Sequence, residues 1–119
     1  MKHPVLQFQI LSKEPDQTAR FYSDLFGWTV DADNPLGYRR IATGSEEGIQ
    51  GGIWPAPPQA SAFVQLFIGV DDVSAFVQKA EKMGARLVIA PATLPEGDGL
   101  AVLQDPQGMP FGIWRRARA

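Results

Sequence analysis

The residue types that carry most enzyme chemistry are scarce in this chain of 119 residues. It has no cysteine, so thiolate nucleophiles, disulfides and cysteine-ligated metals are excluded. It has one histidine, His3, so a single chain cannot supply a two-histidine metal site, and a serine–histidine pair would depend on that residue. The acidic residues fall mostly in stretches typical of turns, caps and loops, where carboxylates are solvated. The sequence therefore predicts little nucleophilic or acid–base chemistry.

The charge balance narrows the class of partner. Lysine and arginine number 11 and the acidic residues 13, which gives a net charge of −2. Such a chain lacks the basic surface that nucleic-acid phosphates or anionic lipids require. No apolar run approaches the roughly 20 residues of a membrane span, and the first residues, Met-Lys-His-Pro, lack the apolar segment of a signal peptide. We therefore expect a cytoplasmic protein that binds neither nucleic acid nor a membrane.

The pattern of strands and helices is the same in the two halves of the chain. In the first half, the apolar–polar alternation of residues 5–10 predicts a strand, and a helix is expected from Pro15 to Phe26, before Gly27. In the second half, residues 62–70 predict a strand and Asp72 an N-cap, with the helix closed by Gly84. Short strands are expected at 28–30, 38–42, 49–54, 86–89, 99–103 and 109–114.

Landmarks that recur at near-constant spacing favour an internal duplication over chance recurrence. Gln7 corresponds to Gln65, Gly27 to Gly84, and Gly52-Ile53-Trp54 to Gly112-Ile113-Trp114. Each half is too short to bury a good core by itself, and a proline-rich stretch that cannot continue a sheet joins the halves. We predict one domain, residues 1–119, with module one at about 4–55, a crossover at 55–61 and module two at about 62–116.

Three motifs resemble those of the vicinal-oxygen-chelate superfamily, which includes glyoxalase I, bleomycin-resistance proteins and extradiol dioxygenases. They are Phe21-Tyr22-Ser23-Asp24-Leu25-Phe26-Gly27-Trp28, Val70-Asp71-Asp72-Val73, and Asp105-Pro106-Gln107-Gly108, with Met109 where the family usually has asparagine. The resemblance implies an α+β, glyoxalase-like fold, in which two tandem βαβββ modules form a curved, cup-like mixed sheet with helices on the outside. The same residues have structural roles: Phe21, Tyr22 and Phe26 are expected in the core, and residues 105–108 suit a type I turn.

The resemblance also implies where a metal would be bound. Ligands in the family come from the first and last strands of each half, and the matching positions here are Gln7, Gly52, Gln65 and Gly112. A divalent cation favours imidazole or carboxylate ligands, whereas an amide is neutral and glycine has no side chain. We therefore expect no metal and no other cofactor. Without a cation, the chain has no group that could act as a Lewis acid or activate oxygen.

The strand period predicts which side chains face the cup. Phe8 and Ile10, Leu66 and Ile68, and Phe111 and Ile113 are expected to pack beneath the helices, so their strand neighbours face the other way. The predicted ligand-binding residues are Gln7, Gln9, Gly52, Trp54, Gln65, Phe67, Gly112 and Trp114, with the two glycines leaving room for a ligand. An equally good alternative to a pocket is that Trp54 and Trp114 close the core or a dimer interface.

A few charged residues remain candidates for a role at the cup. Glu96 or Asp98 would lie at its mouth as a base, with solvation as the alternative. One of Arg39 and Arg40 faces the cup, where it would bind an anion, unless both are ordinary surface arginines.

Three functions follow. The first is metal-free binding of a planar, partly apolar small molecule; the second is a metal-dependent lyase, isomerase or dioxygenase; the third is a non-catalytic partner subunit. The ligand positions favour the first, so we predict no catalytic residue. A homodimer is expected in each case, because members of the resembled family often pair and exposed strand edges need covering.

Overall fold

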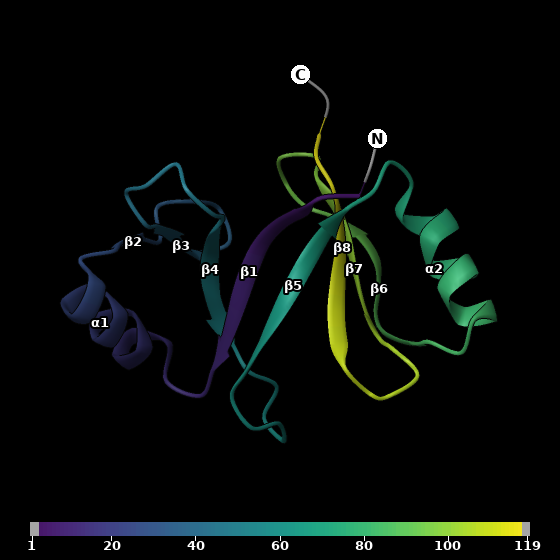
Figure 1. Ribbon diagram of the computed structural model, residues 1–119, viewed down its shortest axis with the longest axis horizontal. Helices are drawn as coiled ribbons and strands as arrows, with labels where there is room; N and C mark the ends of the chain where they lie inside the picture. The colour runs from purple at the N-terminus through teal and green to yellow at the C-terminus, as the bar shows by residue number, and fades with distance from the viewer. Residues whose placement is uncertain (1–2, 118–119) are drawn as a thin grey trace. The chain divides into compact units, whose positions relative to one another are not determined.

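The computed structural model describes residues 3–117, which form two helices and eight strands. These residues divide into two compact units: the first unit is residues 7–65, and the second unit is residues 3–6 together with 66–117. Each unit combines one helix with a mixed sheet (Figure 1). The α+β class and the repeated βαβββ order expected from the sequence are confirmed.

The first unit has a mixed sheet with the strand order β2-β3-β4-β1. The strand β1 pairs in parallel with β4, while β3 is antiparallel to both β2 and β4. A parallel pair requires a long crossover, and the helix α1 and the two short strands supply it. The bounds are β1 (Val5–Ser12), α1 (Pro15–Phe26), β2 (Thr29–Asp31), β3 (Arg39–Ala42) and β4 (Gln50–Pro55).

Proline and glycine set the two ends of α1 as the sequence predicted. Pro15 stands in the first turn, where its missing N–H costs nothing. Gly27 adopts a left-handed conformation with φ 76° and donates its N–H to the Ser23 carbonyl at 2.8 Å. Phe8 and Trp28 pack in a cluster of aromatic rings with Tyr22 of α1, so the side of the sheet that carries Phe8 faces the helix.

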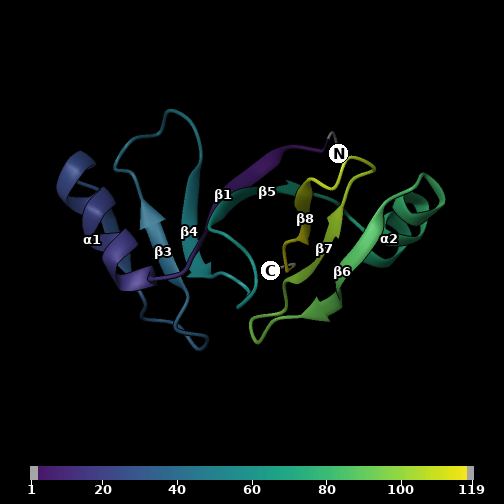
Figure 2. The ribbon, with the colours of Figure 1, turned by 90° about the horizontal axis from the view of Figure 1, so that it is seen from below.

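The second unit repeats this plan with the strand order β5-β8-β7-β6. Here β5 is parallel to β8, and β7 is antiparallel to β6 and β8. Figure 2 shows α2 lying beside β6 and β7. The bounds are β5 (Phe63–Gly69), α2 (Val73–Lys82), β6 (Arg86–Thr93), β7 (Gly99–Gln104) and β8 (Pro110–Arg115).

An aliphatic core holds α2 on its sheet. Its buried members are Val70, Val73, Val77, Ala101, Leu103 and Ile113, with Phe111 among the half-buried side chains around them. The predicted packing of Phe111 and Ile113 towards the helix is therefore confirmed. Asp72 caps α2 by accepting a hydrogen bond from the Ala75 N–H at 3.0 Å.

The Asp105-Pro106-Gln107-Gly108 turn joins β7 and β8 as a hairpin, as expected. The Gly108 N–H donates to the Asp105 carbonyl at 2.8 Å, which closes the turn. The Asp105 carboxylate also accepts from the N–H groups of Gln107 and Met109.

Several burial expectations are wrong. Phe21 and Phe26 are 57% and 59% exposed, because α1 buries none of its residues. Leu66 is 45% exposed, since the buried face of β5 is the one that carries Gln65, Phe67 and Gly69. His3 lies against Phe76, with ring centroids 4.9 Å apart, and its Nδ1 is 3.1 Å from the Gly69 carbonyl oxygen.

Among residues 3–117, neither helix has the length and hydrophobicity needed to cross a membrane.

Candidate functional site

One face of the first unit's sheet collects most of the polar residues that the sequence singled out. The register pairs Phe8 with Gly51 and Gln9 with Gly52. The Phe8 ring covers Gly51 on the α1 side of the sheet. Because side chains alternate along a strand, Gln9 and Gly52 lie on the other face, which we call the α1-distal face. The predicted orientation of the glutamines is confirmed.

Two glutamines that are distant in sequence meet on this face. Gln65 Nε2 donates a hydrogen bond of 2.7 Å to Gln9 Oε1. Both side chains are buried, with exposed fractions of 6% and 9%. Burial of an amide is costly unless its polar atoms form hydrogen bonds, and here each amide supplies one hydrogen-bond partner to the other. One lone pair of the Gln9 oxygen is thereby used, and its Nε2 remains a donor.

Tyr38 is the residue that sequence reasoning missed. Its ring lies over Gly52, in the space that a Cβ atom at position 52 would occupy. The expectation that Gly52 leaves room for a ligand is therefore wrong. The Tyr38 hydroxyl is buried, and it has no hydrogen-bond partner in the part of the chain that the structure describes.

The position of Tyr38 is set by the loop that precedes β3. The Asn34 side chain accepts a hydrogen bond from the Tyr38 N–H at 2.9 Å and donates one to the Tyr38 carbonyl at 2.6 Å. Gly37, with φ 65°, allows the chain to turn between them. The segment Asn34-Pro35-Leu36-Gly37 is a turn signal directly before Tyr38, and only that signal pointed to this arrangement in the sequence.

Burial determines the protonation state of this hydroxyl. Desolvation raises the pKa of the Tyr38 phenol above its usual value of 10.0, and the Gln9 amide nearby lowers it only in part. Gln9 pairs in register with Gly52, which the phenol covers, so its amide lies beside the phenol, although the two groups are not hydrogen-bonded. At neutral pH the group is therefore an uncharged hydroxyl, able to donate a proton in a hydrogen bond.

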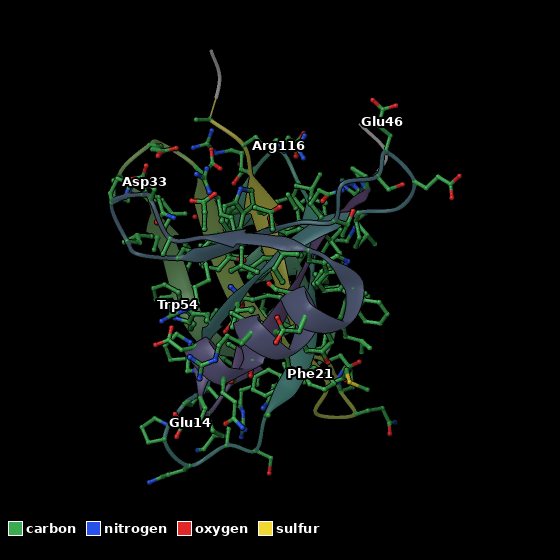
Figure 3. The ribbon with its side chains drawn as sticks, turned by 90° about the vertical axis from the view of Figure 1, so that its left-hand side faces the viewer. Glu14, Phe21, Asp33, Glu46, Trp54 and Arg116 are labelled. Carbon is green, nitrogen blue, oxygen red and sulfur yellow. The ribbon has the colours of Figure 1, made fainter. Side chains whose placement is uncertain are left out.

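Trp54 provides an accessible aromatic surface beside Tyr38. Its ring centroid is 5.8 Å from that of Tyr38, and 36% of the residue is exposed. Figure 3 labels Trp54 on this part of the molecule. An exposed indole next to polar groups is typical of sites that hold planar ligands. The half-buried Gln7 lies on the same face by strand alternation.

The structure assigns the two arginines to opposite faces. Arg39 is on the α1 side, where its guanidinium binds the Asp16 carboxylate at 2.6 Å. Arg40 pairs in register with Gly52, so it lies on the α1-distal face, 3.5 Å from the Asp31 carboxylate. Arg40 is therefore the arginine on the face of the candidate site.

The remaining predicted site residues form a separate group within the second unit. Phe67 is 2% exposed, and its ring fills the space that a side chain at position 112 would need. The expected room beside Gly112 is thus absent. Trp114 meets the Phe67 ring edge-on at 5.2 Å. Phe67 therefore packs as core rather than standing as an open wall.

Asp98 anchors Trp114. Its carboxylate accepts hydrogen bonds from Trp114 Nε1 at 2.8 Å and from the Ala117 N–H. A carboxylate that accepts one hydrogen bond at each oxygen is held in place. Glu96, the other residue considered as a base, is exposed.

The residues at the four family ligand positions do not fit a divalent cation. No three histidine, aspartate or glutamate side chains within residues 3–117 come together as a metal site would require. Gln65 is bonded to Gln9, and Tyr38 and Phe67 occupy the spaces beside Gly52 and Gly112. Neutral amide oxygens are weak ligands and aromatic rings are none, so these residues do not supply the charged or imidazole ligands that a divalent cation favours.

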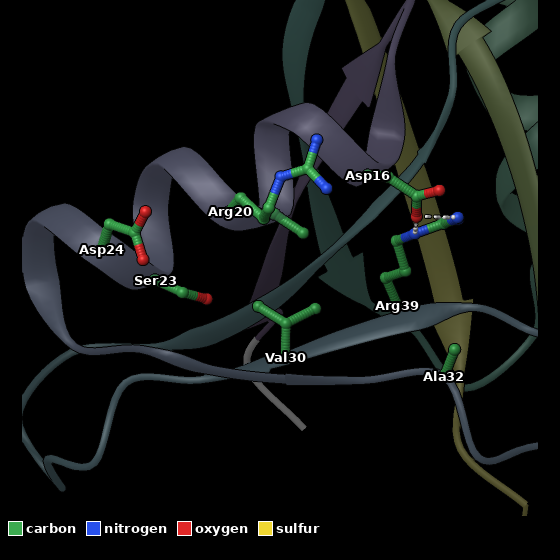
Figure 4. A pocket seen from close by; sticks show the side chains of 8 residues that line it. Asp16, Arg20, Ser23, Asp24, Val30, Ala32 and Arg39 are labelled. Atoms are coloured by element: carbon green, nitrogen blue, oxygen red, sulfur yellow. Dashed lines mark hydrogen bonds and ion pairs between the residues drawn. The ribbon is translucent and has the colours of Figure 1, made fainter.

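In the first unit, a shallow hollow of about 330 Å³ lies on the α1 side of the sheet, between α1 and the strands β2 and β3 (Figure 4). None of the predicted ligand-binding residues contributes to it. The residues around it are Asp16, Ala19, Arg20, Ser23, Asp24, Val30, Ala32 and Arg39.

Comparison with known proteins identifies the fold. A solved structure from Bacillus halodurans C-125, titled hypothetical protein BH1468, superposes with a TM-score of 0.70 at 12% identity. The match covers 100% of this chain and 98% of that one. At this level of identity the likeness concerns the fold alone.

Two relatives are similar in sequence. "Putative glyoxylase CFP32" of Mycobacterium tuberculosis is 33% identical over 113 residues, which covers 87% of this chain and 42% of the relative. "Anthracycline biosynthesis protein DnrV" of Streptomyces peucetius is 25% identical over 125 residues, which covers 92% of this chain and 46% of the relative. The chain spans less than half the length of either relative.

The family itself is shown by a match that spans both modules. The model described as "Glyoxalase-like domain" matches residues 7–114, which contain both helices and all the strands except the first two residues of β1 and the last residue of β8. The three motifs that suggested this resemblance lie within those residues. The chain therefore belongs to the glyoxalase-like domain family of the vicinal-oxygen-chelate superfamily.

Proposed function

We propose that this chain binds a planar, partly apolar organic molecule without the help of a metal. The observation that carries the proposal is the amide–phenol cluster, by which we mean Gln9, Gln65 and Tyr38, beside the exposed indole of Trp54. Aromatic surface next to a few well-placed polar groups is the composition of a small-molecule site. Gln65 stands at one of the ligand positions that the resemblance implies, Tyr38 covers a second one, Gly52, and the members of the cluster are neutral.

The relatives support an aromatic ligand. DnrV of Streptomyces peucetius and DauV of Streptomyces sp. strain C5 are named for anthracycline biosynthesis. Anthracyclines contain a planar quinone, which an indole can stack upon. We therefore propose that the ligand of this chain is also planar and conjugated.

Truncation of Trp54 is expected to weaken binding of a planar ligand about tenfold or more, because stacking on an aromatic side chain contributes roughly 1–3 kcal/mol per ring system. Anthraquinone-2-sulfonate is a soluble probe with the required shape. Its affinity for wild-type protein and for Trp54→Ala is measured by isothermal titration calorimetry. Trp28→Phe is the matched control, since Trp28 packs with Tyr22 on the α1 side and binding should be unchanged.

Two results would contradict the proposal. One is a wild-type protein that takes up none of the planar probes at millimolar concentration. The other is a site that needs a cation: stoichiometric retention of Zn²⁺, Ni²⁺, Mn²⁺ or Fe²⁺ that Gln65→Ala abolishes. The second result would favour a metal-dependent enzyme, the activity that the name of CFP32 suggests.

We also propose that a second copy of this chain covers α1. The helix buries none of its residues, and Phe21, Leu25 and Phe26 are 57–59% exposed (Figure 3 labels Phe21). The relatives are more than twice as long as their match to this chain, so each has enough residues to supply a second such domain within one polypeptide. A second copy of this domain would cover the helix by association.

Light scattering coupled to size exclusion tests this association. We expect wild-type protein to elute at twice its chain mass of 13.0 kDa, and Leu25→Glu to elute as a monomer, because a buried unpaired carboxylate is costly. Gln17→Glu is the control: it adds the same charge at an exposed polar position of α1 and should remain a dimer. A monomeric wild type, or a Leu25→Glu protein that still pairs, would refute the proposal.

A further inference from the structure

The Tyr38 hydroxyl is the one buried side-chain polar atom in the described residues without a hydrogen-bond partner. Buried polar groups are nearly always paired, because an unpaired one loses its hydration without compensation. Tyr38 nevertheless adopts this position firmly, since the Asn34 side chain holds both its N–H and its carbonyl. A polar group that is rigidly placed and unsatisfied indicates that its partner comes from outside the chain.

The neighbours of the hydroxyl determine what that partner is. Gln9 is the amide next to the phenol, and its oxygen already accepts from Gln65. The other polar group of the Gln9 side chain, Nε2, can only donate. No oxygen in the described residues lies within hydrogen-bond reach of the phenol, so the hydroxyl hydrogen lacks an acceptor.

Gly52 makes this arrangement possible. The phenol oxygen lies where the first carbon of any side chain at position 52 would stand. The family places a metal ligand at that position, and such a side chain would exclude Tyr38. The absence of a metal-ligating side chain at position 52 is thus what allows the Tyr38 phenol to lie there.

We propose that Tyr38 replaces the family's cation as the electrophilic group of the site: its hydroxyl donates a hydrogen bond to a carbonyl oxygen of a planar, conjugated ligand such as a quinone or aryl ketone. This inference rests on the proposed function and names the ligand chemistry of the same site. A neutral hydroxyl that donates from a dry position holds a carbonyl oxygen well but does not attract a cation or an ammonium group.

A pair of probes with one shape separates carbonyl recognition from stacking. Anthraquinone-2-sulfonate and anthracene-2-sulfonate differ in the two ring carbonyls, and Tyr38→Phe removes the hydroxyl while it keeps the ring. We expect wild type to bind the quinone about tenfold more tightly than the hydrocarbon. Tyr38→Phe should lose about tenfold in affinity for the quinone and keep its affinity for the hydrocarbon, so that it binds both probes equally.

A thermal scan of the free proteins adds a second readout. Because the hydroxyl is unsatisfied, Tyr38→Phe should melt no lower than wild type, and a higher melting temperature is the expected result. A variant that loses affinity for both probes to the same extent, or for neither, would overturn the inference while binding of planar ligands stands. Failure of wild type to bind either probe would instead overturn the proposed function itself.

Discussion

Replacing Phe67 with alanine is expected to lower the free energy of unfolding by about 3–5 kcal/mol, the usual cost of truncating a buried aromatic ring. Phe67 is 2% exposed, and its ring occupies the space beside Gly112 and meets Trp114 edge-on. No small neighbouring side chain can fill the cavity, because the residue opposite is a glycine. Urea unfolding followed by circular dichroism measures the change as a shift in the midpoint.

The control and the converse change make this test specific. Met109→Ala removes a side chain from a residue that is 63% exposed and should alter stability by no more than about 0.5 kcal/mol. Gly112→Ala adds a carbon where the Phe67 ring lies, so it should also destabilise, and Phe67→Leu should partly rescue it. If Phe67→Ala unfolds at nearly the wild-type urea concentration, the ring is not core and the ligand-binding role expected from the sequence is the better interpretation.

Replacing Gly52 with alanine should displace Tyr38, at a cost of about 1–3 kcal/mol in stability and with loss of carbonyl recognition. The new methyl group would overlap the phenol oxygen, which sits at the end of a rigid ring whose backbone Asn34 holds. Gly99→Ala is the matched control, because its added carbon would meet Val73 Cγ2 at 3.6 Å, an ordinary contact. It should behave like wild type in unfolding and in quinone binding.

The tyrosine titration reports where the phenol lies. Because the chain has two tyrosines, a Tyr22→Phe background leaves Tyr38 as the only phenol. Burial raises the pKa of Tyr38, so its ultraviolet phenolate band should appear above pH 10.0, and Gly52→Ala should return the transition towards that value.

The same shift predicts how stability depends on pH. The unfolded state releases the Tyr38 proton first, so the contribution of Tyr38 is complete below pH 10.0 and is lost as pH rises through the folded pKa. A Tyr38 that titrates normally in wild type would mean that the hydroxyl is open to water, contrary to the structure.

Much of the local structure could be predicted from the sequence because it depends on short-range chemistry. Pro15 and Gly27 bound α1, Asp72 caps α2, and Asp105 organises the hairpin turn, each through contacts with residues a few positions away. The strand period also places Gln9 on the face opposite Phe8. The repeated order of elements and the three motifs predicted the fold family, and the comparisons confirm it.

The sequence also showed that the four ligand positions carry glutamine or glycine. It predicted empty space beside Gly52 and Gly112, where the structure has aromatic rings. Periodicity states which face of a strand a residue occupies, whereas the contents of the neighbouring volume depend on which distant residues the register brings there. Tyr38 reaches Gly52 through the pairing of β3 with β4, and Phe67 reaches Gly112 through the pairing of β5 with β8. The exposure of α1 likewise follows from how much of the helix its sheet covers, because an amphipathic pattern is the same whether a sheet or another molecule buries it. Residue types and local order were thus determined by the sequence alone, and the phenol at the candidate site was decided by long-range strand pairing.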